Sequence, residues 1–489
     1  MIAPRKAAWS DRFEMVVGLE VHAQLATATK LFCRCSTDFG ALPNANTCPV
    51  CLALPGVLPA LNDAAVELAG RAAVALGCTI RSTSNFARKH YFYPDLPKGY
   101  QISQFDRPIA VGGCVEIGRR TDGSPINIAV TRVHIEEDAG RLIHDRFAGA
   151  SAVDLNRAGV PLIEIVSEPE MRGSQEADAY LRAVKQILEY AAVSDVSMER
   201  GSLRVDANVS ARRLGDSALG TKVEIKNMNS FSSVARALEA EYARQCAALD
   251  AGDRVEQQTM LWDELAEVVR PARRKEGSDD YRYFPEPDLP PLIISLERID
   301  RLKRELPELP AARRTRYRSA FPALSEYDIT LLTESRATSD YFEHVARSSG
   351  DAKASANWML REVLGALKAT DQTIDHFTVR PADLAALLCL VRDGVVSHSA
   401  AKQIFTHMVQ SGDSPRQLAE REGLLRVGDD ALLRQWIDEA LAEHPSEAAR
   451  FLGGERRLHG VIIGYVMRKS NGSADPRRVG QLLDDRVGA

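Results

Sequence analysis

The sequence lacks the long apolar segments that would insert it into a membrane or direct its export. Nowhere in the 489 residues does an uninterrupted apolar run reach the ~18 residues that a membrane-spanning helix needs. Residues 1–15 contain no apolar core of the kind found in signal peptides. We therefore expect a cytoplasmic protein, and a chain of this length is expected to form two to four domains.

Other absences concern nucleotide and nucleic-acid binding. The sequence contains no GxxxxGK[ST] phosphate-binding loop, so any ATP would have to be held by a bound cation and its ligands. The formal net charge of −5 is small for the length, and it neither indicates nor excludes a nucleic-acid partner. Function must therefore be sought in local clusters of residues.

The eight cysteines do not form a secreted disulfide framework, because four of them occur as two close pairs. Cys33 and Cys35 form one pair, and Cys48 and Cys51 form the other. Four thiolates on one loop can close a tetrahedral site, and sulfur ligands favour zinc over magnesium or calcium. The pattern predicts a structural zinc site in the loop 33–51; a redox pair or unligated thiols are the alternatives.

Carboxylates interrupt segments that otherwise have the pattern of buried strands. Glu164 lies within the apolar run 162–166, although ionised Asp and Glu are almost never fully buried unless they are paired or bind a metal. In the strand predicted over residues 13–25, alternation places Glu20 and His22 on one face. They could form half of a divalent-metal site, or they could belong to an exposed polar face.

The strand predicted over residues 126–137 ends in two consecutive carboxylates. Alternation places Glu136 on the same face as His134, and Glu137 on the same face as Ile135. The local pattern does not choose between the two acids.

The character of the chain changes near Leu296. Before it, strand patterns dominate, and residues 273–291 are predicted to form a loop or crossing strand because they combine charged, aromatic and proline residues. After it, strand signals vanish. Helical periodicity predicts helices over residues 330–348, 352–369, 381–395 and 399–410.

The chain remains helical from Gly412 onward, and its last part is locally basic. Between Phe451 and Val479, six basic residues face two acids, Glu455 and Asp475, an excess of four positive charges. The simplest interpretation is a solvated helical face, but a phosphate-backbone contact is also plausible. The six basic residues are Arg456, Arg457, Arg468, Lys469, Arg477 and Arg478.

Taken together, these motifs resemble one family over essentially the whole chain. The chain is similar to the B subunit of the aspartyl/glutamyl-tRNA(Asn/Gln) amidotransferases in the segments GLEVHAQL, CRC, CPVC, FYPDLPKGYQISQFD, HIEEDAG, VDLNRAGVPLIEIVSEPE, GSLRVDANVS, EIKNMNSF, KEGSDDYRYFPEPDLPP and GYVMRKSNGSADPRRVGQLL. The helical region contains no long insertion, and in this the chain resembles the B subunit of the bacterial heterotrimer. The related archaeal tRNA(Gln)-specific subunit carries an extra domain there.

The resemblance implies a multi-domain α+β fold. A cradle domain (1–295), built on a mainly antiparallel β-sheet with flanking helices, would precede an all-α helical domain (296–411) and a small all-α, tRNA-binding tail domain (412–489). The implied activity is conversion of misacylated Asp-tRNA(Asn) or Glu-tRNA(Gln) to the amide, through an acyl phosphate made with ATP and Mg²⁺. Ammonia would come from glutamine hydrolysed on an amidase-type A subunit, and a small C subunit would complete the heterotrimer. This chain has no Gly/Ser-rich amidase signature and is not expected to hydrolyse glutamine itself.

The resemblance also assigns roles to residues. It selects Glu137 over Glu136 and implies that Glu20, His22, Glu137 and Glu164 hold the divalent metal at the catalytic site. The cysteine loop of this chain matches that of a zinc-carrying branch of the family. The basic tail matches a module that contacts the tRNA body in this family. Further candidates for contacts with ATP or its cation are Lys89, Lys98, Arg157, Asp206, Glu224 and Lys226.

Two other functions fit the sequence less well. A tRNA-binding scaffold with its chemistry elsewhere is disfavoured by the carboxylates in buried strands. An autonomous zinc hydrolase is disfavoured because four thiolates leave zinc no open position.

Overall fold

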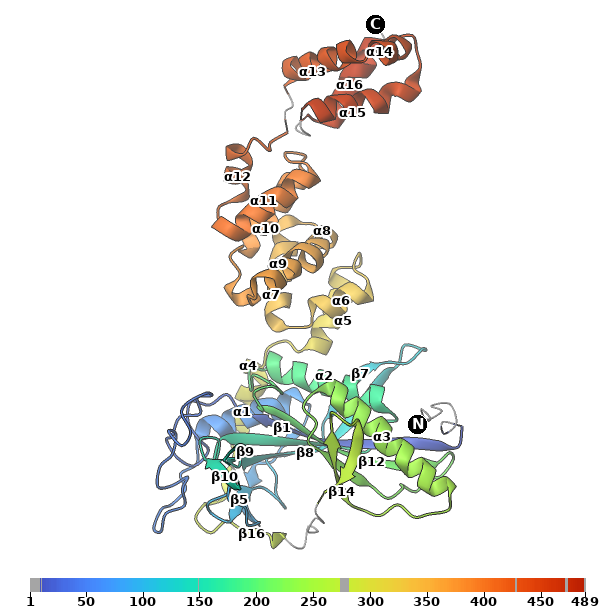
Figure 1. The fold of residues 1–489 in the computed structure, drawn as a ribbon. Helices are drawn as coiled ribbons and strands as arrows, with labels where there is room; N and C mark the ends of the chain where they lie inside the picture. Colours follow the sequence, from blue (N-terminus) through green and yellow to red (C-terminus); the bar gives the residue numbers. More distant parts are fainter. Residues whose placement is uncertain are drawn as a thin grey trace. The chain divides into compact units, whose positions relative to one another are not determined.

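The computed structural model describes Trp9 and residues 11–147, 149–272, 281–426, 429–470 and 474–487. The chain divides into two compact units, residues 1–312 and 313–489 (Figure 1). Part of the predicted loop or crossing strand, residues 273–280, lies outside the described residues. Among the helices that the structure describes, none is long and apolar enough to cross a membrane.

The first unit is built on one large β-sheet whose paired strands are antiparallel, except for the parallel pair β13 and β14. In spatial order its strands are β15 (Val268–Pro271), β14 (Thr259–Asp263), β13 (Val223–Lys226), β12 (Leu203–Arg213), β1 (Phe13–Gln24), β11 (Pro161–Ser167), β8 (Pro125–Glu137), β6 (Ala110–Val111) and β2 (Thr79–Ile80), and β7 (Cys114–Arg119) also pairs with β8. The mainly antiparallel sheet confirms the predicted fold class of this part.

Alternation in β1 explains why the two faces of this sheet differ. Its odd-numbered residues from Met15 to Ala23 belong to the hydrophobic core, so Glu20 and His22 point to the opposite face. The same core includes buried residues of α1 (Asp63–Ala75), α2 (Ser174–Tyr190) and α3 (Phe231–Asp250). Figure 1 shows α2 and α3 on one side of the sheet. The other face is left for polar side chains.

Small sheets complete the first unit. They pair β4 (Ala87–His90) with β5 (Tyr100–Ser103) and β16 (Phe284–Pro285), β9 (Arg141–Phe147) with β10 (Ala150–Asp154), and β3 (Thr83–Ser84) with β17 (Leu292–Ile293). The β4–β16 pair is fastened by Arg88, whose guanidinium donates two hydrogen bonds of 2.8 Å to the buried Glu286. The segment after residue 280 is thereby held beside β4.

The second unit is helical, as predicted, and its described residues form two separate hydrophobic cores. The helix α4 (Leu296–Glu305) belongs to the first unit. The first core of the second unit forms among α5 (Pro310–Ala320), α6 (Glu326–Leu332), α7 (Arg336–Ser349), α8 (Ala352–Trp358), the π-helical turn η2 (Met359–Val363), α9 (Leu364–Thr370), the 3₁₀ turn η3 (Ile374–His376), α10 (Pro381–Arg392), α11 (His398–Ser411) and α12 (Pro415–Arg421). The second forms among α13 (Asp430–Glu443), α14 (Pro445–Leu452), the 3₁₀ turn η4 (Arg456–Leu458), α15 (His459–Lys469) and α16 (Pro476–Val487).

One predicted helix is wrong in its extent. Residues 330–348 do not form a single helix, because α6 ends at Leu332 and α7 begins at Arg336. The side chain of Ser335 accepts a hydrogen bond from the backbone N–H of Thr338 and so caps the second helix. The apolar periodicity runs across this break, whereas the capping serine marks it.

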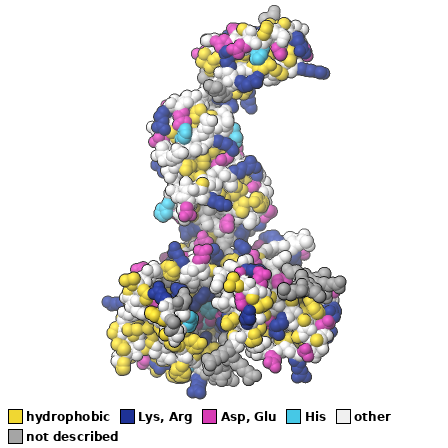
Figure 2. Space-filling model, in the orientation of Figure 1, with side chains coloured by type: hydrophobic (Ala, Val, Ile, Leu, Met, Phe, Trp, Pro, Cys, Tyr) yellow, Lys and Arg dark blue, Asp and Glu magenta, His cyan; other side chains and the backbone are white. Residues whose placement is uncertain are grey.

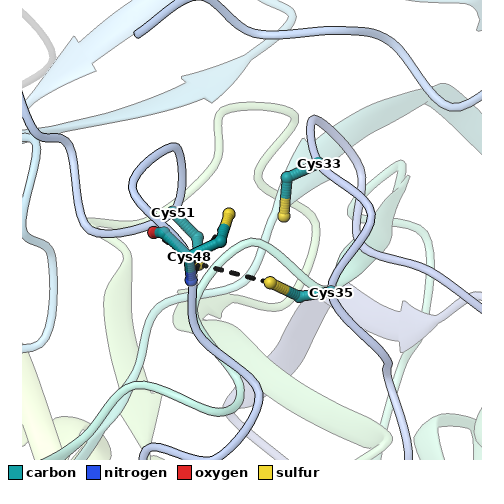
Figure 3. Close-up of side chains that lie close together, drawn as sticks. All are labelled: Cys33, Cys35, Cys48 and Cys51. Atoms are coloured by element: carbon teal, nitrogen blue, oxygen red, sulfur yellow. Dashed lines mark hydrogen bonds between the residues drawn. The ribbon is translucent and has the colours of Figure 1, made fainter.

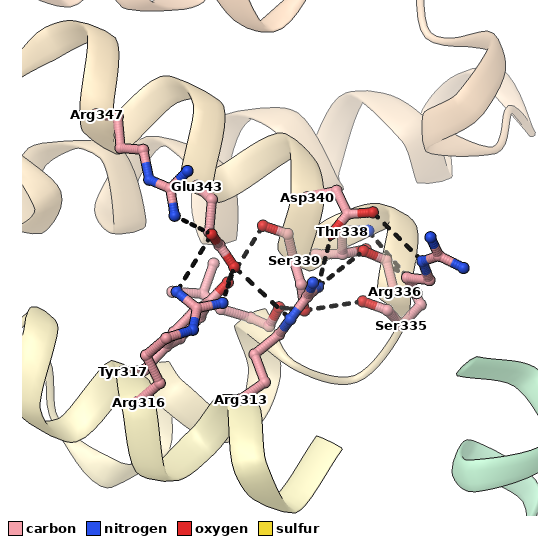
Figure 4. A network of polar contacts seen from close by, with 11 residues as sticks. Arg313, Arg316, Tyr317, Ser335, Arg336, Thr338, Ser339, Asp340, Glu343 and Arg347 are labelled. Atoms are coloured by element: carbon pink, nitrogen blue, oxygen red, sulfur yellow. Dashed lines mark hydrogen bonds and ion pairs between the residues drawn. The ribbon is translucent and has the colours of Figure 1, made fainter. Parts of the chain in front are cut away.

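Glu343 joins α5 to α7 (Figure 4). Its carboxylate accepts hydrogen bonds from the buried Tyr317 hydroxyl at 3.1 Å, from Arg316 at 2.6 Å and from Arg347 at 2.7 Å. The buried guanidinium of Arg313 lies 3.6 Å from the same carboxylate. One acid therefore serves several donors in a region that excludes much of the solvent.

Replacing Glu343 with Ala is expected to lower the free energy of unfolding of the second unit by roughly 3 kcal/mol, because buried donors lose their shared acceptor. Urea unfolding followed by circular dichroism measures the loss. The matched control is Glu420→Ala, which breaks an exposed pair with Arg416 and should cost less than about 0.5 kcal/mol. Equal losses in the two variants would show that the Glu343 network does not stabilise the helices.

Candidate active site

The polar face of the large sheet brings together acids that are far apart in the sequence. His22 on β1 lies directly opposite Glu164 on β11, and Glu164 lies opposite His134 on β8. On the other side of β1, Glu20 lies opposite Asp206 on β12. Because directly paired residues of antiparallel strands point to the same face, these side chains form one continuous polar floor.

Two imidazoles and two carboxylates occupy the centre of this floor. The Glu164 Oε2 atom lies 3.3 Å from His22 Nε2 and 3.3 Å from His134 Nε2. The carboxylate of Glu136 lies 3.8 Å from His22 Nε2 and 3.5 Å from His134 Nε2. His22, Glu136 and Glu164 each offer one ligand atom, and these three atoms lie within 4.8 Å of one another.

Each imidazole and carboxylate of this group favours the other's charged form, whereas Glu164 disfavours the charged form of Glu136. Burial alone raises the pKa of Glu164, but the imidazoles of His134 and His22 outweigh it and hold this pKa well below its usual value. Burial lowers the pKa of His134, but Glu164 and Glu136 outweigh it and raise this pKa to about 9. Two buried carboxylates are thus kept ionised beside protonated imidazoles, and a bound cation would replace the proton of any imidazole that ligates it.

Glu137 lies apart from this group. Alternation along β8 directs its side chain away from Glu136, and its carboxylate accepts hydrogen bonds from the ammonium of Lys98 and, at 2.8 Å, from the backbone N–H of Ile102. A cavity of about 210 Å³ lies beside Glu137 and Lys98 and is also lined by Cys33 and Cys51. The structure therefore brings His22 and Glu164 together with Glu136, and the assignment of Glu137 as a metal ligand stays a prediction.

A second acidic group lies farther along the same face. Glu20, Asp206 and Glu224 offer one oxygen each within 4.8 Å of one another. Lys226 donates to Asp206, and its Nζ lies 3.0 Å from Glu224 Oε1, while Asn208 donates to Glu20 at 3.0 Å. Burial and the neighbouring carboxylates raise the pKa of Glu20. The ammonium of Lys226 stays protonated and cannot ligate a metal, whereas an imidazole can lose its proton and become a ligand, so the group of His22, Glu136 and Glu164 is the better candidate for a cation.

The remaining predicted ATP contacts have different surroundings. The Nζ of Lys89 lies 5.0 Å from the centre of the Tyr281 ring. Burial lowers the pKa of Lys89, but the charge of Glu136 helps to outweigh it and raises this pKa above its usual value. Arg157 instead donates to two backbone carbonyls, at 2.9 and 2.6 Å, and holds the turn at residues 139–140. Lys89 thus remains available to the polar floor, whereas Arg157 has a local structural role.

The four clustered cysteines converge from two turns of their loop (Figure 3). The Cys51 Sγ atom lies 4.0 Å from Cys35 Sγ and 3.9 Å from Cys48 Sγ, and all four thiols, Cys33 included, are free of disulfides. Around a tetrahedral zinc ion with Zn–S bonds of about 2.3 Å, neighbouring sulfurs would lie about 3.8 Å apart. The spacing and the four-sulfur donor set therefore fit zinc.

The basic tail is partly neutralised within its own helices. Lys469 lies 2.5 Å from Glu443, Arg478 pairs with Asp430, and Arg468 stacks over the ring of Tyr465. In the space-filling view, dark blue and magenta side chains intermingle on the visible face (Figure 2). Four of the six predicted contacts have no charged side-chain partner within the described part of the chain: Arg456, Arg457, Arg468 and Arg477.

Two members of the central group were not selected from the sequence. His134 and Glu136 share a strand face, which the alternation of β8 indicated, but their approach to Glu164 depends on the pairing of β8 with β11. Their neighbour Asp138 is also buried, where it accepts hydrogen bonds from Arg204 at 2.7 Å and Gln24 at 2.8 Å. The sequence signal that could have identified His134 and Glu136 is a cluster of acids at the end of a strand that also carries a histidine.

Comparisons with known proteins identify the family of the chain. A family model described as the GatB/GatE catalytic domain matches residues 15–300, and one described as the GatB domain matches residues 340–487. Three similar proteins are each named as the B subunit of an aspartyl/glutamyl-tRNA(Asn/Gln) amidotransferase. That of Trichodesmium erythraeum is 47% identical over 484 residues, covering 97% of this chain and 98% of its own. That of Thermosynechococcus vestitus is 48% identical over 483 residues (97% and 96%), and that of Moorella thermoacetica is 48% identical over 477 residues (97% and 100%). The chain therefore belongs to the family of aspartyl/glutamyl-tRNA(Asn/Gln) amidotransferase B subunits.

Proposed function

We propose that this chain activates the side-chain carboxylate of a misacylated tRNA with ATP and then directs its amidation. The substrate would be Asp-tRNA(Asn), Glu-tRNA(Gln) or both, as in the names of its relatives. One observation carries the proposal: the half-buried His22 and the buried, ionised Glu136 and Glu164 offer ligand atoms within 4.8 Å of one another on a polar sheet face, in a chain without a phosphate-binding loop.

The donors of this group fit a divalent cation such as Mg²⁺. Two carboxylates and one imidazole supply hard and borderline ligand atoms within 4.8 Å of one another. Bound there, Mg²⁺ would neutralise phosphate charge on ATP and orient the phosphoryl group for transfer. Glu136 meets this geometry. Glu137, the ligand implied by the family resemblance, would first have to leave Lys98 and Ile102.

Side chains of the polar floor would supply fixed positive charge. Burial lowers the pKa of Lys226, but Asp206 and Glu224 outweigh it and raise this pKa, and the pKa of Lys89 is raised likewise. Both lysines therefore stay protonated and would contact phosphate oxygens as cations, not as proton acceptors. Transfer of the γ-phosphoryl group to the substrate carboxylate would give an acyl phosphate, which ammonia would attack with loss of phosphate.

The other parts of the chain would support this reaction. We propose structural zinc in the cysteine loop, a three-part division at residues 1–295, 296–411 and 412–489, and contact of the basic tail with tRNA. The partners would be an amidase-type glutaminase, the A subunit, and a small C subunit, in a cytoplasmic heterotrimer. The separate core around α13–α16 supports a distinct tail domain.

The experiment is amidation of Glu-tRNA(Gln) and Asp-tRNA(Asn) by the complex of this chain with its partner subunits, with ATP and Mg²⁺ omitted in turn. We expect amide formation with at least one tRNA, and loss of nearly all of it when either ATP or Mg²⁺ is withheld. Free ammonia should replace glutamine as the nitrogen source without removing the need for ATP. Amidation that persists without ATP would contradict the proposal.

A further inference from the structure

Two buried donors contact the carboxylates of the candidate cation site. His134 of β8 directs its Nε2 atom at both of them, 3.3 Å from Glu164 Oε2 and 3.5 Å from Glu136 Oε2. The hydroxyl of Ser103, on β5, donates a hydrogen bond of 3.2 Å to the same Glu136 Oε2 atom. Both donors are buried, and neither belongs to the group whose ligand atoms converge on the proposed cation. Their place beside its ligands therefore calls for another explanation.

Glu136 presents its two oxygens to different neighbours. Its Oε2 atom faces the two donors, Ser103 and His134, whereas its Oε1 atom lies 3.8 Å from His22 Nε2. The terminal torsion of a glutamate is otherwise soft, so a carboxylate with one oxygen fixed keeps the direction of the other. The donors thus turn Oε1 of Glu136 toward the place where the ligand atoms of His22 and Glu164 converge.

The two imidazoles that flank Glu164 have different surroundings. Strand register places Glu164 opposite His22 on β1 and opposite His134 on β8, so it lies between them. The side chain of His22 is 16% exposed, whereas that of His134 is 6% exposed. The Nδ1 atom of His134 is buried and has no hydrogen-bond partner among the described residues. A cation that arrives from solvent would meet His22, and all polar contacts of His134 are directed through Nε2 at the carboxylates.

We propose that His134, assisted by Ser103, is a positioning residue of the cation site: its Nε2–H is shared between Glu164 and Glu136 and holds both carboxylates in the orientation that binds Mg²⁺. The proposal rests on the proposed function. Contacts of 3.3 and 3.5 Å are long for a single hydrogen bond, as expected when one N–H serves two acceptors. Hydrogen bonds of this kind orient the ligands of many protein metal sites.

The positioning role does not depend on the charge of His134. The Nε2–H donor is present both in the protonated ring and in the neutral tautomer that carries its hydrogen on Nε2. If His134 supplied only positive charge, it would compete with the cation for the two acids, and its removal would leave metal binding unchanged or make it tighter. Orientation has the opposite consequence, because carboxylates without their donor turn toward other partners and bind the metal less tightly.

The test is the affinity of the reconstituted complex for Mn²⁺, measured by electron paramagnetic resonance, in His134→Leu, His134→Gln and Ser103→Ala. Leucine removes the donor, whereas the amide nitrogen of glutamine reaches about the position of Nε2 and donates. The Kd for Mn²⁺ is expected to rise by roughly tenfold to a hundredfold in His134→Leu, the usual cost of losing such a hydrogen bond. It should stay within about threefold of the wild type in His134→Gln, and rise by roughly threefold to tenfold in Ser103→Ala.

The spectrum distinguishes positioning from direct ligation. At saturating Mn²⁺, the ¹⁴N coupling from His22 should persist unchanged in all three variants, since His134 is not a ligand. Ser103→Ala removes a single oxygen atom and should fold even if His134→Leu does not. The matched control is Val133→Ala, which truncates a buried core residue of the same strand. It should lower the melting temperature and leave the Kd for Mn²⁺ unchanged, which separates metal affinity from stability.

Three results would overturn the assignment. These are unchanged or tighter Mn²⁺ binding in every folded variant among His134→Leu and Ser103→Ala, an equal loss of affinity in His134→Gln and His134→Leu, and the disappearance of one of two nitrogen couplings in His134→Gln. A wild-type complex without a tight Mn²⁺ site, or one whose affinity is unchanged by Glu164→Gln, would instead overturn the cation site of the proposed function.

Discussion

Replacing Glu164 with Gln is expected to lower the rate of ATP-dependent amidation by roughly a hundredfold or more, while leaving the fold intact. The substitution keeps the size of the side chain but removes the charge that lies 3.3 Å from both His22 and His134. A bound divalent cation contributes several kcal/mol to phosphoryl transfer, and each 1.4 kcal/mol is about a factor of ten in rate. The measurement is kcat for amidation in the reconstituted complex at saturating ATP and tRNA.

Two neighbouring substitutions sharpen this expectation. Glu136→Gln should behave as Glu164→Gln does, whereas Glu137→Gln should retain tight metal binding because its carboxylate is engaged by Lys98 and Ile102. The control is Glu116→Gln, a half-buried acid of β7 outside both acidic groups. If Glu137→Gln loses metal affinity and Glu136→Gln does not, the family resemblance identified the ligand correctly, and the metal site requires a rearrangement of Glu137.

Removing two of the clustered cysteines, by Cys48→Ser together with Cys51→Ser, is expected to abolish zinc binding and to lower the thermal stability of the first unit. A closed four-thiolate site stabilises its fold through the metal, so the loop 33–51 would lose its main constraint. Metal analysis should give one zinc per wild-type chain and none in the variant. The melting temperature should fall by roughly 5–10 °C, as expected for a loss of a few kcal/mol in a domain of this size.

The chemistry should survive this loss in the molecules that remain folded. Four thiolates leave no coordination position for substrate, so kcat below the melting transition should fall by less than about fivefold. The control is Cys114→Ser, since Cys114 is exposed and lies outside the cluster. A zinc-free wild-type chain, or a double variant with unchanged melting temperature, would show that the cluster does not hold structural zinc.

Local sequence patterns predicted the elements of the fold better than their ends. Alternation placed the first strand over residues 13–25, and β1 spans Phe13–Gln24, because its buried and polar faces are both strongly marked. The same kind of periodicity merged α6 with α7, since apolar spacing continues across a break that only the Ser335 cap reveals. Caps act over three residues, and periodicity averages over many.

The candidate site was predictable only in part, because strand register is a non-local property. Alternation placed His22 on a polar strand face, and the structure pairs it directly with Glu164. The proximity of Glu136 to both, and of Lys226 to Asp206, follows from neighbouring strands and not from spacing along one strand.

The most direct test of the central claim is Mn²⁺ binding to the complex, followed by electron paramagnetic resonance. The account predicts one tight Mn²⁺ per chain whose electron–nuclear spectrum contains a ¹⁴N coupling from the imidazole of His22. That coupling should vanish in His22→Gln, and tight binding should vanish in Glu164→Gln and Glu136→Gln. Tight Mn²⁺ binding that shows no nitrogen coupling, or that is unchanged in all three variants, would contradict the placement of the cation on this polar floor.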